Sequence, residues 1–467
     1  MDAVEKEIIG LFDAANWIKT DDNKDIYDAC ADHNYVWRLI VELNHYKRNN
    51  NKKDFFDDID MFSYTNDMFS SFNRFLVIYE SLCKCNVEIP FSPDDLCKFI
   101  IQISINNLNY TFPRNHRGNY IPSKLENVDS PFFTVNDISN IDTDISVDLT
   151  QKILDVFSVA FSDLTIEKMD EIIEYNGKYI CIYPIYFVSK MYKILEKYYI
   201  DIVKNKDEYY KMRGRGFENL VCNMLGDFLS SEKIYSNYCY LTPKEKNELD
   251  FVLDSEKDII IFEAKSSKYN EPKNFMDEES DIVFDLKKSF GRGFKTLDKA
   301  KDYFSNNVEV MLKKGDKSVK INTKGKNIHI ILVSFNHMKS ISGRITKIID
   351  NSRIINIPIC LNYCDLNAIL VNARTLNRFV EYLSKKEYLC KYKKLSFEFD
   401  EIDAYGIMMS NKFDTLTERI EIMKNIDLVF MLNDATYRNK AVEEISSKFL
   451  WMLIEGYTDI IDRLNLN

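Results

Sequence analysis

One short apolar run of this chain contains two opposite charges that a buried strand rarely tolerates. Residues 258–265 read DIIIFEAK, so Glu263 and Lys265 stand within and at the end of an apolar segment. Continuous apolar runs of this length are typical of strands that are covered on both faces. Side chains alternate along a strand, so Glu263 and Lys265 point to the same face. Because charges are rarely buried without a partner or a chemical task, this segment strongly limits what the chain can be.

A second carboxylate is brought to the same place by the preceding strand. Residues 248–253 and 259–265 are two predicted strands, and a polar turn joins them. Paired as an antiparallel hairpin, they place Asp250 opposite Phe262 or Glu263. Two carboxylates and the Lys265 ammonium then converge at one end of the hairpin.

This set of side chains suits a particular chemistry. Carboxylates bind hard cations such as Mg²⁺ or Mn²⁺, and magnesium often takes only one or two carboxylates beside water and substrate phosphate. A nearby lysine can stabilise phosphate charge or activate a water. Glu218 lies early in a predicted helix, residues 214–229, from which it reaches the same end of the sheet. The set predicts hydrolysis of a phosphodiester, and the alternative is a buried ion pair of Lys265 with Asp250 or Glu263.

Helical and extended patterns alternate around these segments. From residue 213 to residue 390 the predicted order of elements is α-β-β-β-α-β-α. The later elements are a helix near 294–304, a strand at 328–335 and a helix at 365–383. An earlier hairpin is predicted within residues 175–188, with Asn176-Gly177 as its turn.

Four divisions of the chain are predicted from these patterns. Prolines and a run of Asp interrupt the periodicity between residues 111 and 148, which predicts an irregular linker there. The divisions are a mostly helical N-terminal domain (1–148), a helical and hairpin connector (149–212), an α/β domain (213–390) and a C-terminal extension with a long last helix at about 437–464 (391–467).

Three segments taken together resemble a known enzyme family. RGFE (215–218), NELDFVL (247–253) and IIIFEAK (259–265) resemble the PD-(D/E)xK nuclease superfamily, in its Holliday-junction-resolvase and NERD-type branch. The resemblance covers residues 213–390. It implies the restriction-endonuclease-like fold, an αβββαβ core with a mixed central sheet.

The resemblance also implies roles for individual residues. Asp250 and Glu263 would be metal ligands, Lys265 the catalytic lysine, and Glu218 the helix acid that completes the metal site. The implied cofactor is Mg²⁺ or Mn²⁺. Relatives often carry a glutamine on the next helix, where this chain has lysines, among them Lys295.

Positive charge is concentrated in one part of an acidic chain. The net charge is −11, so the overall field does not steer the chain onto nucleic acid. Residues 284–350 nevertheless carry 15 Lys and Arg against 6 Asp and Glu, which indicates a nucleic-acid contact or, alternatively, a solvated lysine-rich face. Residues 287–295 are predicted to be a basic, glycine-containing turn before a helix. The predicted nucleic-acid-binding residues are Arg213, Arg215, Lys268, Lys287, Lys288, Arg292 and Lys295.

Composition excludes several other classes of protein. With 13 Gly and 9 Pro, the chain is neither collagen-like nor a Pro/Gly-rich disordered chain. Its 10 Cys include no CxxC pair, which predicts reduced thiols and a cytoplasmic location. No apolar run approaches the ~20 residues that a membrane helix needs. No P-loop motif occurs, and His329, inside an apolar strand, is predicted to be a core histidine.

These features predict a cytoplasmic, Mg²⁺- or Mn²⁺-dependent endonuclease acting on DNA, with double-stranded DNA as the first choice. Double-strand cleavage by such a fold needs two active sites, so a homodimer or higher homo-oligomer is expected. Defence against phage or foreign DNA would suit a nuclease joined to an unfamiliar N-terminal domain. Two alternatives stay open: a non-catalytic nucleic-acid-binding or scaffold subunit that retains the fold, and a ribonuclease.

Overall fold

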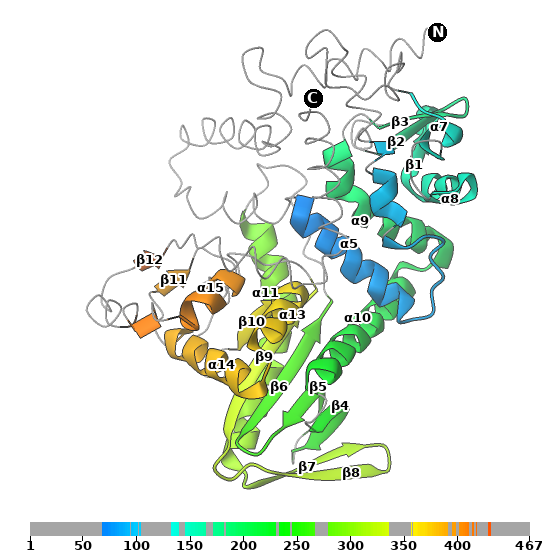
Figure 1. The fold of residues 1–467 in the computed structure, drawn as a ribbon. Helices are drawn as coiled ribbons and strands as arrows, with labels where there is room; N and C mark the ends of the chain where they lie inside the picture. The colour runs from blue at the N-terminus through cyan, green and yellow to red at the C-terminus, as the bar shows by residue number, and fades with distance from the viewer. Residues whose placement is uncertain are drawn as a thin grey trace. The chain divides into compact units, whose positions relative to one another are not determined.

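A computed structural model shows two compact units in the chain (Figure 1). The first comprises Met1–Leu76, Glu88–Tyr209 and Ser447–Asn467, and the second Val77–Val87 and Tyr210–Ser446. None of the described helices is both long and apolar enough to cross a membrane. The structure describes residues 68–93, 95–100, 102–103, 132–139, 145–164, 171–181, 184–229, 233–242, 245–266, 279–335, 356, 358–390, 395–397, 401–410, 413–414, 417 and 428–430.

In its described part, the first unit combines helices with a small three-stranded sheet. Strand order in this sheet is β1-β2-β3. The predicted hairpin turn is confirmed, because Asn176 and Gly177 have φ angles of 52° and 74° between β2 and β3. The elements are the first part of α5 (Met68–Cys83), α7 (Val135–Ser139), α8 (Val147–Phe157), β1 (Ser158–Ala160), the 3₁₀ helix η2 (Phe161–Asp163), β2 (Ile172–Tyr175), β3 (Lys178–Cys181) and α9 (Pro184–Val203).

Two expectations for this unit need correction. The predicted linker is not irregular throughout, since α7 lies inside it and α8 begins at Val147. The side chain of Ser146 caps α8 by accepting a hydrogen bond from the Leu149 amide at 3.2 Å. The second half of the expected hairpin is helical, because α9 already begins at Pro184, a residue type that favours the first turn of a helix. The helices expected before residue 68 lie outside the described residues.

A mixed seven-stranded sheet forms the centre of the second unit, which confirms the predicted mixed α/β class. Strand order is β10-β9-β6-β5-β4-β7-β8. The neighbours β10, β9 and β6 are parallel, and the remaining pairs are antiparallel. The strands are β4 (Lys233–Leu241), β5 (Lys246–Asp254), β6 (Asp258–Lys265), β7 (Glu309–Lys314), β8 (Lys317–Asn322), β9 (Asn327–Ser334) and β10 (Ile359–Asn362). A separate parallel pair is β11 (Leu395–Phe397) with β12 (Leu428–Phe430).

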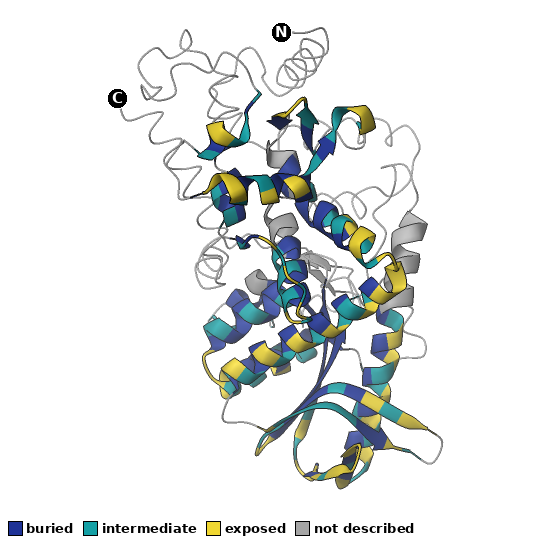
Figure 2. Ribbon diagram, turned by 90° about the vertical axis from the view of Figure 1, so that its right-hand side faces the viewer, coloured by how far each residue is buried: buried dark blue, intermediate teal, exposed yellow. Residues whose placement is uncertain are grey.

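Helices cover both faces of this sheet. A β-carbon at Gly293 of α11 would touch Leu332 of β9, whereas His329, three positions earlier on β9, contacts α14. Residues three apart on a strand point to opposite faces, so α11 and α14 lie on opposite faces. Figure 2 shows the central strands buried and the β7–β8 hairpin largely exposed. The helices are α10 (Lys206–Phe228), α11 (Glu279–Asn306), α13 (Tyr363–Ala373), α14 (Leu376–Cys390) and α15 (Glu401–Met408).

Three predicted helices of this unit have different bounds in the structure. The basic turn predicted at residues 287–295 is wrong, because the whole span lies inside α11. Phe290, Phe294 and Leu297 are buried at helical spacing, which overrides the two glycines between them. The predicted helix 365–383 is two helices, since Arg374 takes a left-handed φ of 59° between α13 and α14. Helix α10 begins at Lys206, so Gly214 and Gly216 lie in its interior. The long last helix lies outside the described residues.

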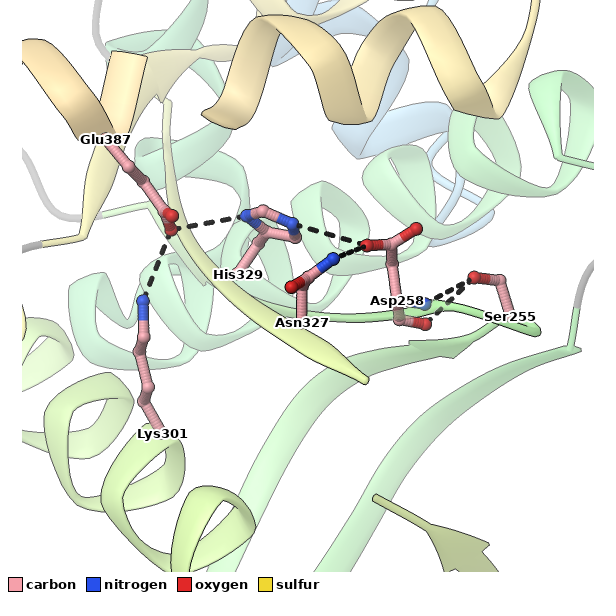
Figure 3. A network of polar contacts seen from close by, with 6 residues as sticks. All are labelled: Ser255, Asp258, Lys301, Asn327, His329 and Glu387. Atoms are coloured by element: carbon pink, nitrogen blue, oxygen red, sulfur yellow. Dashed lines mark hydrogen bonds and ion pairs between the residues drawn. The ribbon is translucent and has the colours of Figure 1, made fainter. Parts of the chain in front are cut away.

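A buried polar network links the end of the sheet at which β6 begins to helices α11 and α14 (Figure 3). His329 lies with Nδ1 3.3 Å from Glu387 of α14 and Nε2 3.7 Å from Asp258, the first residue of β6. Asn327 donates to the same Asp258 carboxylate at 2.9 Å, and Lys301 of α11 lies 3.3 Å from Glu387. The predicted role of His329 as a buried core histidine agrees with its 3% exposure.

Candidate active site

The antiparallel ladder between β5 and β6 stops at the residues singled out from the sequence. Its last pair is Phe251 with Phe262, so Asp250 and Glu263 are the next residues on the two strands. The predicted register is therefore confirmed. Beyond the ladder, the amide of Ala264 donates to Oδ2 of Asp250 at 2.7 Å. A carboxylate thus accepts the bond that a strand carbonyl would otherwise take, which fixes Asp250 against β6.

Glu263 and Lys265 form an ion pair on one face of β6. The ammonium of Lys265 hydrogen-bonds Oε1 of Glu263. The Glu263 side chain is 7% exposed and the Lys265 side chain 25% exposed, so the pair is largely removed from water. The second oxygen of Glu263, Oε2, is buried and has no hydrogen-bond partner among the described residues. A buried, unpaired carboxylate oxygen is costly unless something binds it.

Glu218 of α10 shares the electrostatic environment of this pair. Burial raises the pKa of Glu218 to about 7, and the negative charge of Asp250 adds to the shift while Lys265 opposes it. Burial, together with the charge of Asp250, likewise raises the pKa of Glu263 to about 7. Burial also raises the pKa of Asp250. The three carboxylates therefore lie close enough to repel one another, and Lys265 acts on all of them.

Lys265 stays protonated in this setting. Burial alone lowers the pKa of its ammonium, but the charges of Glu263, Asp250 and Glu218 raise it, and the net direction is upward. The three predicted acids thus all interact electrostatically with Lys265. A protonated lysine can stabilise phosphate charge, whereas it cannot take a proton from water.

Arg213 does not have the role predicted for it. It is 2% exposed, and its Nη2 donates to the carbonyl of Ser266 at 2.5 Å. Its guanidinium also lies over the rings of Phe335 and Tyr210, at 4.6 and 4.9 Å from their centroids. Because this side chain is buried and engaged, Arg213 is removed from the phosphate-binding set and instead holds the backbone that follows Lys265.

The other predicted basic residues differ in whether the structure describes their side chains and leaves them exposed. Arg215 on α10 and both Arg292 and Lys295 on α11 are exposed. Lys287 and Lys288 belong to α11, although their side chains are not described, and Lys268 lies outside the described residues. Two further lysines of α11 serve the fold. Lys299 pairs with Glu245 at 2.7 Å, and Lys301 with Glu387 at 3.3 Å.

Glu248 is a site residue that the sequence reasoning missed. It is exposed and lies two positions before Asp250 on β5, and its charge raises the pKa of both Asp250 and Glu218. The signal for it was present in the segment NELD, where two acids are spaced by two residues as on one side of a strand.

Carboxylate oxygens are suitable ligands for a divalent cation, but the described carboxylates are not arranged as a closed metal site. Among the described residues, no group of three or more His, Cys, Asp or Glu is arranged to hold a metal ion. Magnesium needs only one or two carboxylates, however. The unpaired Oε2 of Glu263 and the carboxylate of Asp250, which repels Glu263, are two suitable donors. Asp250 and Glu263 are therefore the residues that would hold such an ion.

A comparison with known protein families matches this region. The family model described as "Domain of unknown function (DUF4143)" matches residues 213–333. The matched span begins in α10, ends in β9 and contains Glu218, Asp250, Glu263 and Lys265. No curated protein and no solved structure matches the chain.

Proposed function

We propose that residues 213–390 are a metal-dependent endonuclease domain that hydrolyses phosphodiester bonds of DNA. The observation that carries the proposal is the convergence of Asp250, Glu263 and Glu218 on one protonated lysine where the β5–β6 ladder ends. Structural ion pairs usually match charges one to one, whereas this site has an excess of carboxylate. Such an excess suits a site that is completed by a cation.

The arrangement of elements supports a restriction-endonuclease-like core as part of the proposal. Helix α10 precedes three antiparallel strands, β4, β5 and β6, and α11 then connects β6 to the parallel strand β9. This is the αβββαβ order, with the β7–β8 hairpin inserted before the last strand. The three acids and Lys265 lie where the ladder between its second and third strands opens.

Each side chain has a defined task in this reaction. Asp250 and Glu263 would hold Mg²⁺ or Mn²⁺, which supplies Lewis acidity and neutralises phosphate charge. The Ala264 amide orients Asp250, and the hydrogen bond from Lys265 favours the ionised form of Glu263, which burial opposes. As a protonated group, Lys265 donates to a phosphate oxygen of the substrate and stabilises the charge that develops there. Glu218 orients a water at the margin of the site.

Exposed cations on the two helices that flank the site, α10 and α11, support nucleic acid as the substrate class. Arg215, Arg292 and Lys295 are the predicted phosphate-contacting residues that the structure leaves exposed. Cleavage of both strands would require a homodimer or higher homo-oligomer. The described cysteines are free thiols, which suits the proposed cytoplasmic location. Defence against phage or foreign DNA remains part of the proposal.

One observation favours the alternative of a non-catalytic nucleic-acid-binding or scaffold subunit. Lys265 and Glu263 already satisfy one another, and no three-ligand cluster exists among the described residues. Calorimetric titration with Mg²⁺ and Mn²⁺ separates the two functions. An endonuclease binds the ion and loses binding in Asp250→Asn, whereas a scaffold shows no binding in either protein.

The test of the proposed function is cleavage by the purified full chain. Supercoiled plasmid, linear duplex, single-stranded DNA and RNA are incubated with Mg²⁺, Mn²⁺ or EDTA. We expect cleavage of DNA that needs the metal and is lost in Asp250→Asn and Lys265→Met. Glu256→Gln, in the exposed turn of the same hairpin, is the matched control and should cleave normally. Cleavage of RNA alone would replace DNA as the substrate, and equal activity in all variants would end the proposal.

A further inference from the structure

Helix α11 passes against Lys265 at a glycine. A β-carbon built at Gly293 would lie 2.7 Å from Cδ1 of Leu332, 3.2 Å from Cε of Lys265 and 3.5 Å from Cγ of Lys265. Contacts under 3.0 Å are essentially never seen for real β-carbons, so any side chain here forces its neighbours to move. Gly293 itself is buried in helical backbone without a positive φ, so close approach and not backbone conformation requires the glycine.

The residue after Lys265 is held from the opposite side. The carbonyl of Ser266 accepts a hydrogen bond from the buried Arg213 of α10. A β-carbon at the neighbouring Gly214 would lie 3.2 Å from Oγ of Ser266. Helix α10 therefore fixes the backbone just beyond Lys265, and α11 limits where the Lys265 side chain can lie.

We propose that Gly293 is a positioning residue for Lys265. Its missing side chain leaves the space occupied by the methylene stem of Lys265, and this placement keeps the ammonium against Glu263. The inference rests on the proposed function, because it concerns the lysine of the same site. The competing role is packing alone, since the nearest neighbour of the added carbon is Leu332 and not Lys265.

The chain contains a matched control for this inference. Gly291 lies two residues earlier in α11, and a β-carbon there would have no atom within 4 Å. Both alanine variants improve the helix propensity of the same helix by about the same amount. Only Gly293→Ala displaces Lys265, so differences between the two variants report the contact.

Kinetics give the first readout. We expect Gly293→Ala to lower kcat by about 3- to 10-fold, because Lys265 must shift by a few tenths of an ångström and a full 1 Å misplacement costs about 100-fold, with KM within about twofold of wild type. Gly291→Ala should leave both constants unchanged. In a Lys265→Met background, Gly293→Ala should cause no further loss. An equal kcat in the two alanine variants, or a full further loss in the Lys265→Met background, contradicts the inference.

A second-site variant separates positioning from packing. Leu332→Val removes the atom that the new methyl group meets first and leaves the contact with Lys265 in place. The double variant Gly293→Ala/Leu332→Val should regain the Tm that Gly293→Ala loses, yet remain slow. If kcat recovers together with Tm, Gly293 serves packing alone and the inference is wrong.

A readout without catalysis distinguishes failure of this inference from failure of the proposed function. Pulse acetylation followed by mass spectrometry reports how reactive Lys265 is, and an ion-paired, half-buried ammonium reacts slowly. We expect the acetylation rate of Lys265 to rise several-fold in Gly293→Ala and not in Gly291→Ala. An unchanged rate overturns the inference even if the protein cleaves DNA, and a raised rate supports it even in a protein that does not.

Discussion

At the scale of single residues, burial and mutual repulsion disfavour the ionised forms of the three carboxylates in this site. Burial and mutual repulsion raise the pKa of Glu218 and of Glu263 to about 7. In a metal-free protein, each of these carboxylates therefore resists ionisation near neutral pH. Such strained ionisation is typical of functional sites, where groups are arranged for a reaction and not for the stability of the fold.

Glu218 gives the clearest pH dependence. Its folded pKa of about 7 lies above the ordinary value of 4.5, so the folded state binds the proton more tightly. The resulting stability is fully present below about pH 4.5 and is lost as the pH rises through about 7. In EDTA, the unfolding free energy of Glu218→Gln should fall by about 1 kcal/mol less than that of wild type over this pH range. The value is reduced because the side chain is partly exposed. Urea unfolding across this pH range measures it, and an unchanged difference between wild type and variant would contradict the assignment.

The sequence predicted the members of the site better than it predicted their neighbours. Asp250, Glu263 and Lys265 were found because charges interrupt an apolar strand, and strand alternation then fixes which side chains meet. Arg213 was assigned wrongly, because nothing in its local sequence shows that Phe335 and Ser266, far along the chain, bury it. The sequence does not indicate the proposed positioning role of Gly293 for the same reason, because that role depends on a tertiary contact with Lys265.

At the scale of elements, three strands with apolar patterns were predicted within a few residues, whereas the charged hairpin β7–β8 and the short buried strand β10 were not. Strands β5, β6 and β9 agree with the expected segments. The β7–β8 hairpin was missed because its lysine-rich segment resembles a solvated face. The sequence does not indicate the first half of α11, because two glycines interrupt its helical pattern and are typical of a turn. Gly216 and Gly293 instead lie where a helix passes close to neighbouring atoms.

The crossing of α10 with α5 offers a test at this scale. A β-carbon at Gly216 would lie 1.9 Å from the carbonyl oxygen of Ser81, which is rigid backbone. Gly216→Ala should therefore lose about 3 kcal/mol of unfolding free energy or more, as expected for overpacking.

Gly226 in the same helix is the control, because a β-carbon there meets nothing within 4 Å. Gly226→Ala should gain about 0.5–1 kcal/mol from helix propensity. Thermal or urea unfolding of both variants measures the difference. Equal effects of the two substitutions would contradict the close crossing.

At the scale of the whole molecule, the two ends of β6 have different surroundings. One end joins a buried polar network, and the other carries the proposed catalytic residues. Asp258 begins the strand and belongs to the network of His329 and Glu387 (Figure 3). Lys265 ends the strand. Burial raises the pKa of Glu387, but its contacts with His329 and Lys301 outweigh this and lower it overall. The neighbours of Glu387 thus favour its ionised form, in contrast to the raised pKa values of the carboxylates at the other end.

This separation predicts opposite results for substitutions at the two ends. His329→Ala leaves the carboxylates of Asp258 and Glu387 buried with one partner fewer, and should cost about 3 kcal/mol of stability. Its kcat for DNA cleavage should be unchanged well below Tm. Lys265→Met should lower the cleavage rate at least about 100-fold with little loss of stability. A large loss of kcat in folded His329→Ala would show that the two ends are coupled.

The central claim is that Asp250, Glu263, Glu218 and Lys265 form a metal-dependent hydrolytic site. Its most direct measurement is the single-turnover rate of cleavage of a labelled DNA duplex with Mn²⁺, compared between wild type, Lys265→Met and the control Glu256→Gln. We predict metal-dependent cleavage by wild type and control, and a rate at least about 100-fold lower in Lys265→Met. Lys265→Met that cleaves as fast as wild type, or a wild type that cleaves equally well in EDTA, would contradict the claim.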